Sequence, residues 1–218
     1  MTRIAIIASI RVTRWRPLAI AMAAAALYAV LGSKVTAIDR LVLAAAAVAA
    51  TSAFVIDDPA AVTVASTPPS LLVRRIGRVL IAAVAVSFWW TIVVAAGIAR
   101  SGPVPIRSIS VELLGLAGVA LAVAAVAAGS GLAERDGLAG ATASMIFYGL
   151  TLVALPSWSP LPRSPGTPGA VTRWLVVTGI SAAVFLWTSR DPALGRWSRP
   201  QLTRSRAPRA LLGATRAR

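Results

Sequence analysis

Six long apolar runs divide the chain, and they constrain its fold more than any other feature of the sequence. In order they cover residues 17–32, 41–56, 79–99, 111–129, 138–156 and 174–189. A helix that crosses the hydrocarbon core of a bilayer needs about 20 mostly apolar residues, with a range of about 17–25. The first, second and sixth runs are short, so each would borrow flanking residues or cross with little tilt. The pattern predicts an all-α, polytopic membrane protein with six transmembrane helices.

The composition of the chain agrees with a lipid environment and removes several kinds of chemistry. Hydrophobic residues make up 57% of the sequence and charged residues 13%, whereas soluble domains carry about 25% charged residues. Cysteine and histidine are both absent, which excludes thiolate and imidazole metal sites and a Ser-His-Asp triad. We therefore expect no catalytic residues and no metal site on this chain.

The cationic residues predict how the chain is oriented in the membrane. The net charge is +15, and Lys34 is the only lysine among 22 cationic residues. With the N-terminus in the cytoplasm, sixteen of these residues lie inside and six outside. Cytoplasmic loops carry the excess of Lys and Arg, so the count predicts the cell inner (plasma) membrane with both termini cytoplasmic. Topology and contact with anionic lipids account for the charge, and we do not expect nucleic acid as a partner.

The two ends of the chain differ in character from the six-span domain, which covers residues 17–189. Residues 1–16 combine arginines with apolar positions at helical spacing, which predicts an interfacial elbow helix on the cytoplasmic leaflet. A signal peptide is the alternative, but Arg11, Arg14 and Arg16 occupy the place of the small-residue cleavage site. Residues 190–218 are rich in Arg, Pro and Ser, and we expect a basic cytoplasmic tail that is disordered or bound to anionic lipid.

Two adjacent aspartates follow the second apolar run, in the stretch DDPAAVTVASTPP. Asp58 precedes Pro59, and these residue types are favoured at the N-cap and the first position of a helix. Asp57 adds negative charge beside the positive helix end. Pro68 and Pro69 stop the segment. The pattern predicts a short cytoplasmic helix over about residues 59–66, which is either a loop helix packed on its own membrane domain or a docking helix for a cytoplasmic partner.

With this segment, the chain resembles the membrane-spanning subunits of ABC transporters of the ABC-2 exporter type, in a reduced actinobacterial form. The likeness covers the elbow, the six spans, the two inside ends and the stretch Asp57-Asp58-Pro59-Ala60-Ala61, followed by Pro68 and Arg74-Arg75. It implies that residues 59–66 form a coupling helix that inserts into a groove of the nucleotide-binding subunit. The residues that would couple to the ATPase are Asp57, Asp58, Pro59, Val62, Val64, Arg74 and Arg75.

The resemblance also implies a function and a set of partners. The chain would be a permease subunit, an exporter working by alternating access, paired with itself or a sister permease and with two ABC ATPase subunits. It contains no GxxxxGK[ST] sequence, so it lacks the P-loop that cradles phosphates. We therefore expect no cofactor on this chain, with ATP and Mg²⁺ bound by the partner ATPase. The longest outside loop, 157–173, is short, which leaves the substrate open.

Three residues within the apolar runs are candidates for a substrate path. Trp89 and Trp90 lie in the middle of the third run, and their indole N–H groups need partners in hydrocarbon. They line a path for an amphipathic substrate or pack between helices. Glu112 lies at the start of the fourth run, where it binds a cation or proton or is a satisfied helix-start carboxylate.

Two other classes of function remain as alternatives to the transporter. An accessory or scaffold membrane protein would recruit a cytoplasmic partner without transporting anything. A membrane-embedded enzyme is disfavoured, because His, Cys and paired intramembrane carboxylates are lacking.

Introduced cysteines test the predicted topology, since the chain has no cysteine of its own. In intact cells, Lys34→Cys, Ser101→Cys and Ser164→Cys should react with an impermeant thiol reagent, whereas Ser205→Cys should react only after the membrane is opened. Labelling of Ser205→Cys from outside would contradict the six-span orientation.

Overall fold

The computed structural model describes residues 15–31, 37–57, 71–101, 105–130, 136–153 and 169–190, and the structural statements below concern these residues. They form helices and a single 3₁₀ turn, without a β-strand in these ranges. The elements are α2 (Trp15–Leu31), α3 (Ala37–Thr51), η1 (Ser52–Val55), α4 (Leu71–Ser101), α5 (Ile106–Ser130), α6 (Asp136–Val153) and α7 (Ala170–Thr188). This confirms the all-helical class.

Four of these helices, α4 to α7, are long and apolar enough to cross a membrane. Helix α2 is apolar but shorter, at 17 residues, and α3 has 15 residues that η1 continues. A multi-pass membrane protein fits these helices, and the count of six crossings stays a prediction. The predicted elbow and tail lie outside the described residues except for Trp15, Arg16 and Arg190, and the predicted coupling helix, 59–66, lies wholly outside them.

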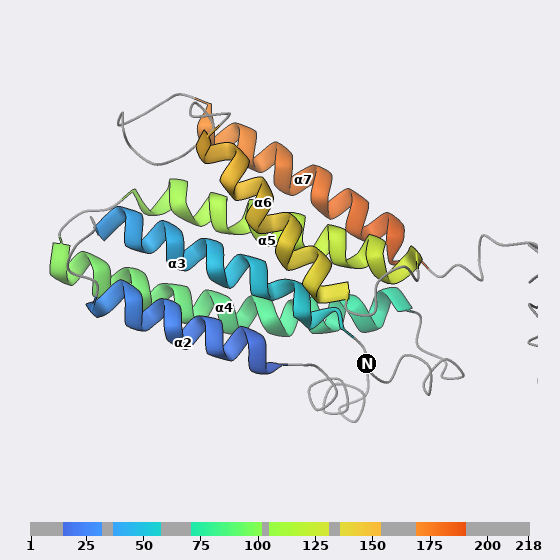
Figure 1. Ribbon diagram of the computed structural model, residues 1–218, viewed down its shortest axis with the longest axis horizontal. Helices are drawn as coiled ribbons and strands as arrows, with labels where there is room; N and C mark the ends of the chain where they lie inside the picture. The colour runs from blue at the N-terminus through green and yellow to red at the C-terminus, as the bar shows by residue number, and fades with distance from the viewer. Residues whose placement is uncertain are drawn as a thin grey trace, which may run out of the picture.

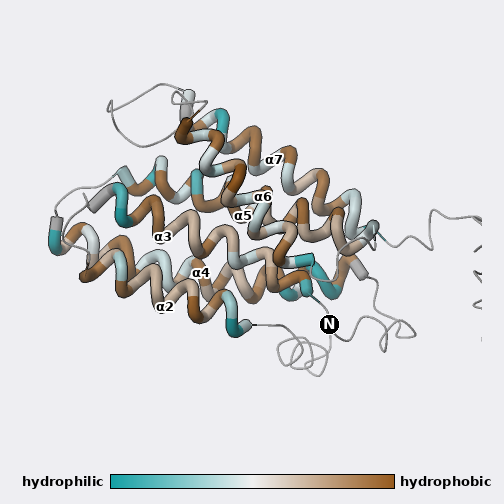
Figure 2. Tube along the Cα trace, viewed as in Figure 1, coloured by the Kyte–Doolittle hydropathy of each residue, from teal (hydrophilic) through white to brown (hydrophobic). Residues whose placement is uncertain are grey.

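Helix α5 is the centre of the bundle. It packs against α3, α6 and α7, whereas α4 packs on α2, α3 and η1. Consecutive helices run in alternate directions, so that α2 begins and α7 ends at the same end of the bundle (Figure 1). Figure 2 shows that the bodies of the helices are largely apolar and that the hydrophilic positions gather toward the helix ends.

Large apolar side chains cover the outside of the bundle as well as its core. Ile20, Val84, Phe88, Ile146 and Ile180 are all exposed in the isolated chain. In water such a surface would be an association hazard, but a lipid bilayer solvates it. The outward faces of α2, α4, α6 and α7 therefore support the membrane assignment.

Small residues bring the backbones of α5 and α6 into direct contact. A Cβ atom added to Gly140 would collide with the Ala120 carbonyl oxygen of α5, and it would lie 2.8 Å from the Ala53 Cβ of η1. One turn earlier, a Cβ on Gly137 would lie 2.7 Å from the Phe54 Cα. Glycine at these positions lets helices approach closely in lipid.

Alanine at Gly140 tests this contact. Because neither the Ala120 carbonyl nor η1 can move aside cheaply, Gly140→Ala should destabilise the fold by about 1–3 kcal/mol. Gly149→Ala, in the same helix, is the matched control, because a Cβ there meets no atom within 4 Å. Thermal unfolding in detergent should give a lower midpoint for Gly140→Ala alone. Equal midpoints for the two variants would mean that the α5–α6 approach is looser than described.

Candidate functional site

Asp57 closes the segment that follows α3, and its carboxylate is used within the bundle. The side chain is 7% exposed, and the Gly137 N–H donates a 2.6 Å hydrogen bond to Asp57 Oδ1. Gly137 is the second residue of α6, so its N–H is one of the orphan donors at a helix start. Asp57 therefore caps α6. The sequence predicted that Asp57 supports the helix that follows it in the chain. No sequence pattern pointed to Gly137, a partner 80 positions away.

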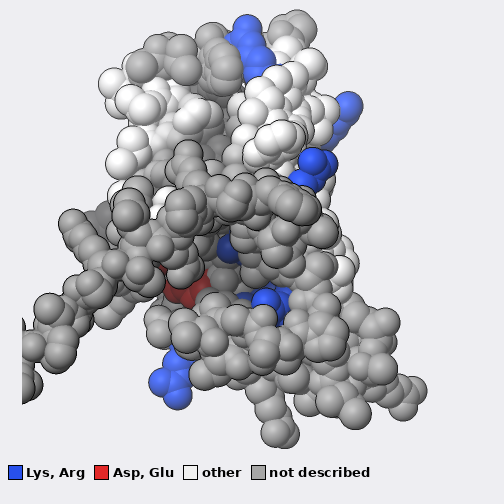
Figure 3. Space-filling view, turned by 90° about the vertical axis from the view of Figure 1, so that its right-hand side faces the viewer, with Lys and Arg blue, Asp and Glu red and all other residues white. Residues whose placement is uncertain are grey.

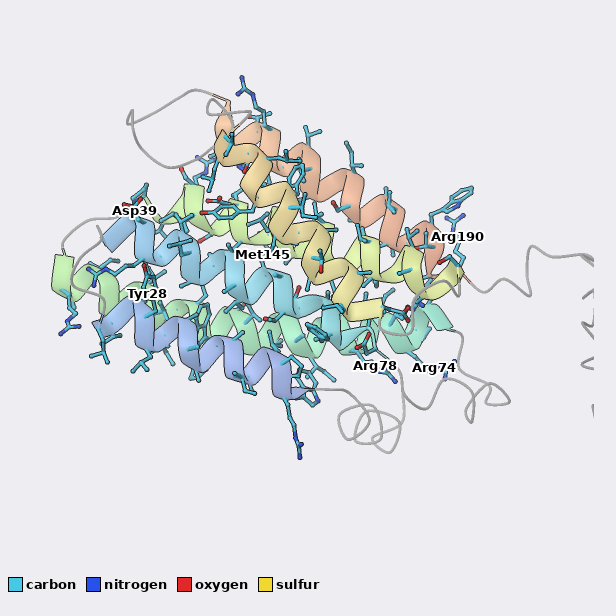
Figure 4. All side chains as sticks on the ribbon, viewed as in Figure 1. Tyr28, Asp39, Arg74, Arg78, Met145 and Arg190 are labelled. Carbon is cyan, nitrogen blue, oxygen red and sulfur yellow. The ribbon has the colours of Figure 1, made fainter. Side chains whose placement is uncertain are left out.

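The first turns of α4 carry three arginines. Arg75 and Arg78 are buried and Arg74 is half-buried. The guanidinium of Arg75 donates a 3.3 Å hydrogen bond to the Ser189 hydroxyl, at the end of α7. Figure 4 shows Arg74 and Arg78 at the end of the bundle opposite to Asp39. Arg75, which the sequence predicted to couple to an ATPase, thus turns its side chain toward α7.

Asp57, Arg75, Asp136 and Ser189 together form what we call the polar end cluster. Asp136, the first residue of α6, lies within electrostatic reach of both Asp57 and Arg75. Figure 3 views this end of the bundle and shows acidic side chains near basic ones. A buried charge is tolerated when it is paired or hydrogen-bonded. The cluster therefore ties η1, α4, α6 and α7 together at one end.

The remaining predicted coupling residues fall in the connection between η1 and α4. Asp58, Pro59, Val62 and Val64 lie outside the described residues. The two ends of that connection are described, however. Asp57 precedes the connection, and α4 resumes after it at Leu71, one turn before Arg75.

Trp89 and Trp90 both pack between helices. Their exposed fractions are 8% and 9%, and their ring centroids are 6.0 Å apart. The Trp89 indole donates to the Met22 carbonyl of α2 at 2.9 Å. The Trp90 indole donates to the Ser110 hydroxyl of α5 at 2.8 Å. Each N–H therefore has the partner that its burial in hydrocarbon requires.

A groove of about 410 Å³ lies between α3, α4 and α5, and Trp90 forms part of its wall. Most of its lining is apolar, with Val48, Ala82, Val86 and Leu121 among the contributors. Its polar lining residues come from η1, α4 and α5: Ser52, Ser87, Trp90, Thr91 and Ser110. A cavity of this size and composition suits a small apolar molecule that makes a few hydrogen bonds.

Among these groove residues, only Trp90 was predicted from the sequence to line a substrate path or pack between helices. Ser87 and Thr91 are four residues apart on α4, which was a weak signal for a shared helix face. Ser52 and Ser110 come from other helices. Only the packing of α3, α4 and α5 brings these hydroxyl groups to one groove.

Glu112 differs from its predicted setting. Helix α5 begins at Ile106, so Glu112 lies inside the helix and not at its start. The side chain is 1% exposed, and neither carboxyl oxygen has a hydrogen-bond partner within the part of the chain that the structure describes. The Tyr148 phenol of α6 lies within electrostatic reach of it. The described ranges hold no group of three or more Asp or Glu that could bind a metal ion.

The cap on α6 can be tested by hydrogen exchange. Asp57→Ala removes the acceptor and should cost about 1 kcal/mol of local stability, equivalent to about fivefold faster exchange in the first turn of α6. Asp57→Asn keeps an acceptor oxygen and should change much less. Exchange in α7 serves as the internal reference. An unchanged rate at residues 137–139 in Asp57→Ala would remove the cap from the account.

Comparison with known proteins identifies no relative. No protein-family model matches the chain, and neither a curated protein nor a solved structure matches it.

Proposed function

We propose that the chain is the membrane-spanning permease subunit of an ABC transporter of the exporter type. It would cross the cell inner membrane six times with both termini in the cytoplasm, and it would pair with itself or with a sister permease. Separate ABC ATPase subunits would bind ATP and Mg²⁺ and hydrolyse the nucleotide. The observation that carries this proposal is the polar end cluster, because it anchors both ends of the connection in which the coupling helix is expected.

The cluster offers a route from that connection into the bundle. Asp57 precedes the connection and caps α6, while Arg75 follows it and contacts the end of α7. An ATPase that displaced the connection would therefore act on α6 and α7 at once. Such a displacement, alternately closing and opening the bundle, is what alternating access requires.

The groove between α3, α4 and α5 supports a substrate path. Helix α4 directly follows the connection, and its residues Val79 to Thr91 form one wall of the groove. A movement of α4 would therefore change the width of the groove. Its apolar lining with scattered hydroxyl groups favours an amphipathic or apolar substrate over an ionic one.

Affinity purification in lipid nanodiscs tests the proposal. The wild-type chain should co-purify, in fixed stoichiometry, with a protein that carries a GxxxxGK[ST] sequence and hydrolyses ATP. Asp58→Ala and replacement of residues 59–66 by a Gly/Ser linker should abolish that association while membrane insertion is unchanged. Asp58 is preferred to Asp57 here, because Asp57 also caps α6.

Asp39→Asn is the matched control, since it removes one carboxylate at the opposite end of the bundle (Figure 4). It should retain the ATPase. Recovery of wild-type amounts of the ATPase with the Gly/Ser linker would contradict the coupling role of residues 59–66. A stoichiometric partner without an ATP-binding sequence would instead support the accessory or scaffold function.

A further inference from the structure

Glu112 is a carboxyl group sealed inside the bundle, and neither the fold nor the proposed function explains it. It lies on α5, the helix that packs against α3, α6 and α7. Both carboxyl oxygens are buried, with no hydrogen-bond partner among the described residues. An ionised carboxylate in such a place costs several kcal/mol or more unless a counter-charge is present. Ionisable residues within membrane helices more often serve a function than a structural purpose.

The described charged groups around α5 do not supply that counter-charge. Helix α5 itself carries Arg107, α3 carries Asp39 and Arg40, and α7 carries Arg173, with Arg190 just after its end. Helix α6 presents Tyr148 and Asp136, and Asp57 follows η1. None of these groups makes an ion pair or a hydrogen bond with Glu112 in the described part of the chain. The Tyr148 phenol lies within electrostatic reach of both Glu112 and Asp39.

We infer that Glu112 is a proton-binding site within the bundle. A proton is the ligand that fits, because both carboxyl oxygens are closed to water-sized contact. A metal ion would need further oxygen ligands, and the described residues gather no such group. An organic cation would need a cavity, and Glu112 lines neither the groove between α3, α4 and α5 nor the shallow depression between α2, α3 and α6.

The exchange reaction is a simple acid dissociation. The Glu112 carboxyl O–H bond breaks, leaving a carboxylate, and the proton passes to water; uptake reverses both steps. The site depends on the burial of Glu112 and not on the identity of any ATPase partner.

Carbodiimide labelling of the full chain in lipid nanodiscs tests this inference. Dicyclohexylcarbodiimide is apolar and reacts with protonated carboxyl groups. Peptide mass mapping should find Glu112 as the main product among the seven acidic residues. The labelling rate should fall about tenfold for each pH unit above the midpoint of the Glu112 titration, because the protonated fraction falls by that factor.

Glu112→Gln should abolish the main product, because the amide keeps the shape of the protonated acid without an exchangeable carboxyl proton. Asp39→Asn, in the first turn of α3, should leave labelling of Glu112 intact. Circular dichroism and elution volume report whether each variant is folded. Should Glu112→Gln not fold, the peptide map and pH profile of the wild-type chain still decide.

Three results would overturn the inference. Absence of label on Glu112 at the acidic end of the profile would mean that the group is not protonated there. A labelling rate independent of pH, with the chain folded throughout, would mean a permanently neutral carboxyl group that exchanges no proton. Rapid labelling by a water-soluble carbodiimide with a soluble amine would mean that Glu112 is open to water and is not sealed inside the bundle.

Discussion

The approach of α6 to α5 at Gly140 is the contact on which the rest of the bundle depends. Lipid tails are as apolar as leucine, so helices in a membrane gain little from burying apolar side chains against one another, and close packing has to hold them together. At Gly140 the approach is limited by the Ala120 carbonyl. Gly137 is three residues earlier on the same helix, and a Cβ there would lie 2.8 Å from the Phe54 ring and 3.0 Å from Asp57 Oδ1. The register that brings the two glycines onto α5 and η1 therefore also delivers the Gly137 N–H to the Asp57 carboxylate.

The charged residues labelled in Figure 4 lie toward the two ends of the bundle, whereas Glu112 does not follow this arrangement. Arg74, Arg78 and Arg190 lie at one end, and Asp39 lies at the other (Figure 4). Charged side chains near helix ends can reach the membrane interface at low cost. Glu112 instead is buried within α5, and neither of its carboxyl oxygens has a hydrogen-bond partner among the described residues. Placement at a helix end therefore does not account for Glu112, whereas the bound proton that we infer would.

The sequence predicts the helices of this protein well and the contacts between them poorly. The runs 79–99 and 111–129 fall within α4 and α5, and both helices extend beyond the runs. Helix α4 begins at Leu71 and includes the arginine turns, and α5 begins at Ile106. That Trp89 and Trp90 need partners for their indole N–H groups follows from burial in hydrocarbon. The identity of these partners, the Met22 carbonyl and the Ser110 hydroxyl, does not follow from the sequence, because tertiary packing selects them. Asp57 shows the same limit. Helix capping rules pointed to the adjacent segment, whereas the described hydrogen bond goes to α6.

The two halves of the bundle differ in how firmly they are held, and this difference bears on movement. Helix α5 makes extensive contacts with both α6 and α7, and Gly115 of α5 lies against the Trp174 ring of α7. Helix α4 packs less extensively, on α2, α3 and η1, and the groove lies between it and α5. Close-packed interfaces resist deformation, so α4 is the element that can shift with least loss of contact. Since α4 also begins where the connection from Asp57 ends, a force on that connection would widen or narrow the groove before it disturbed the α5–α6–α7 core.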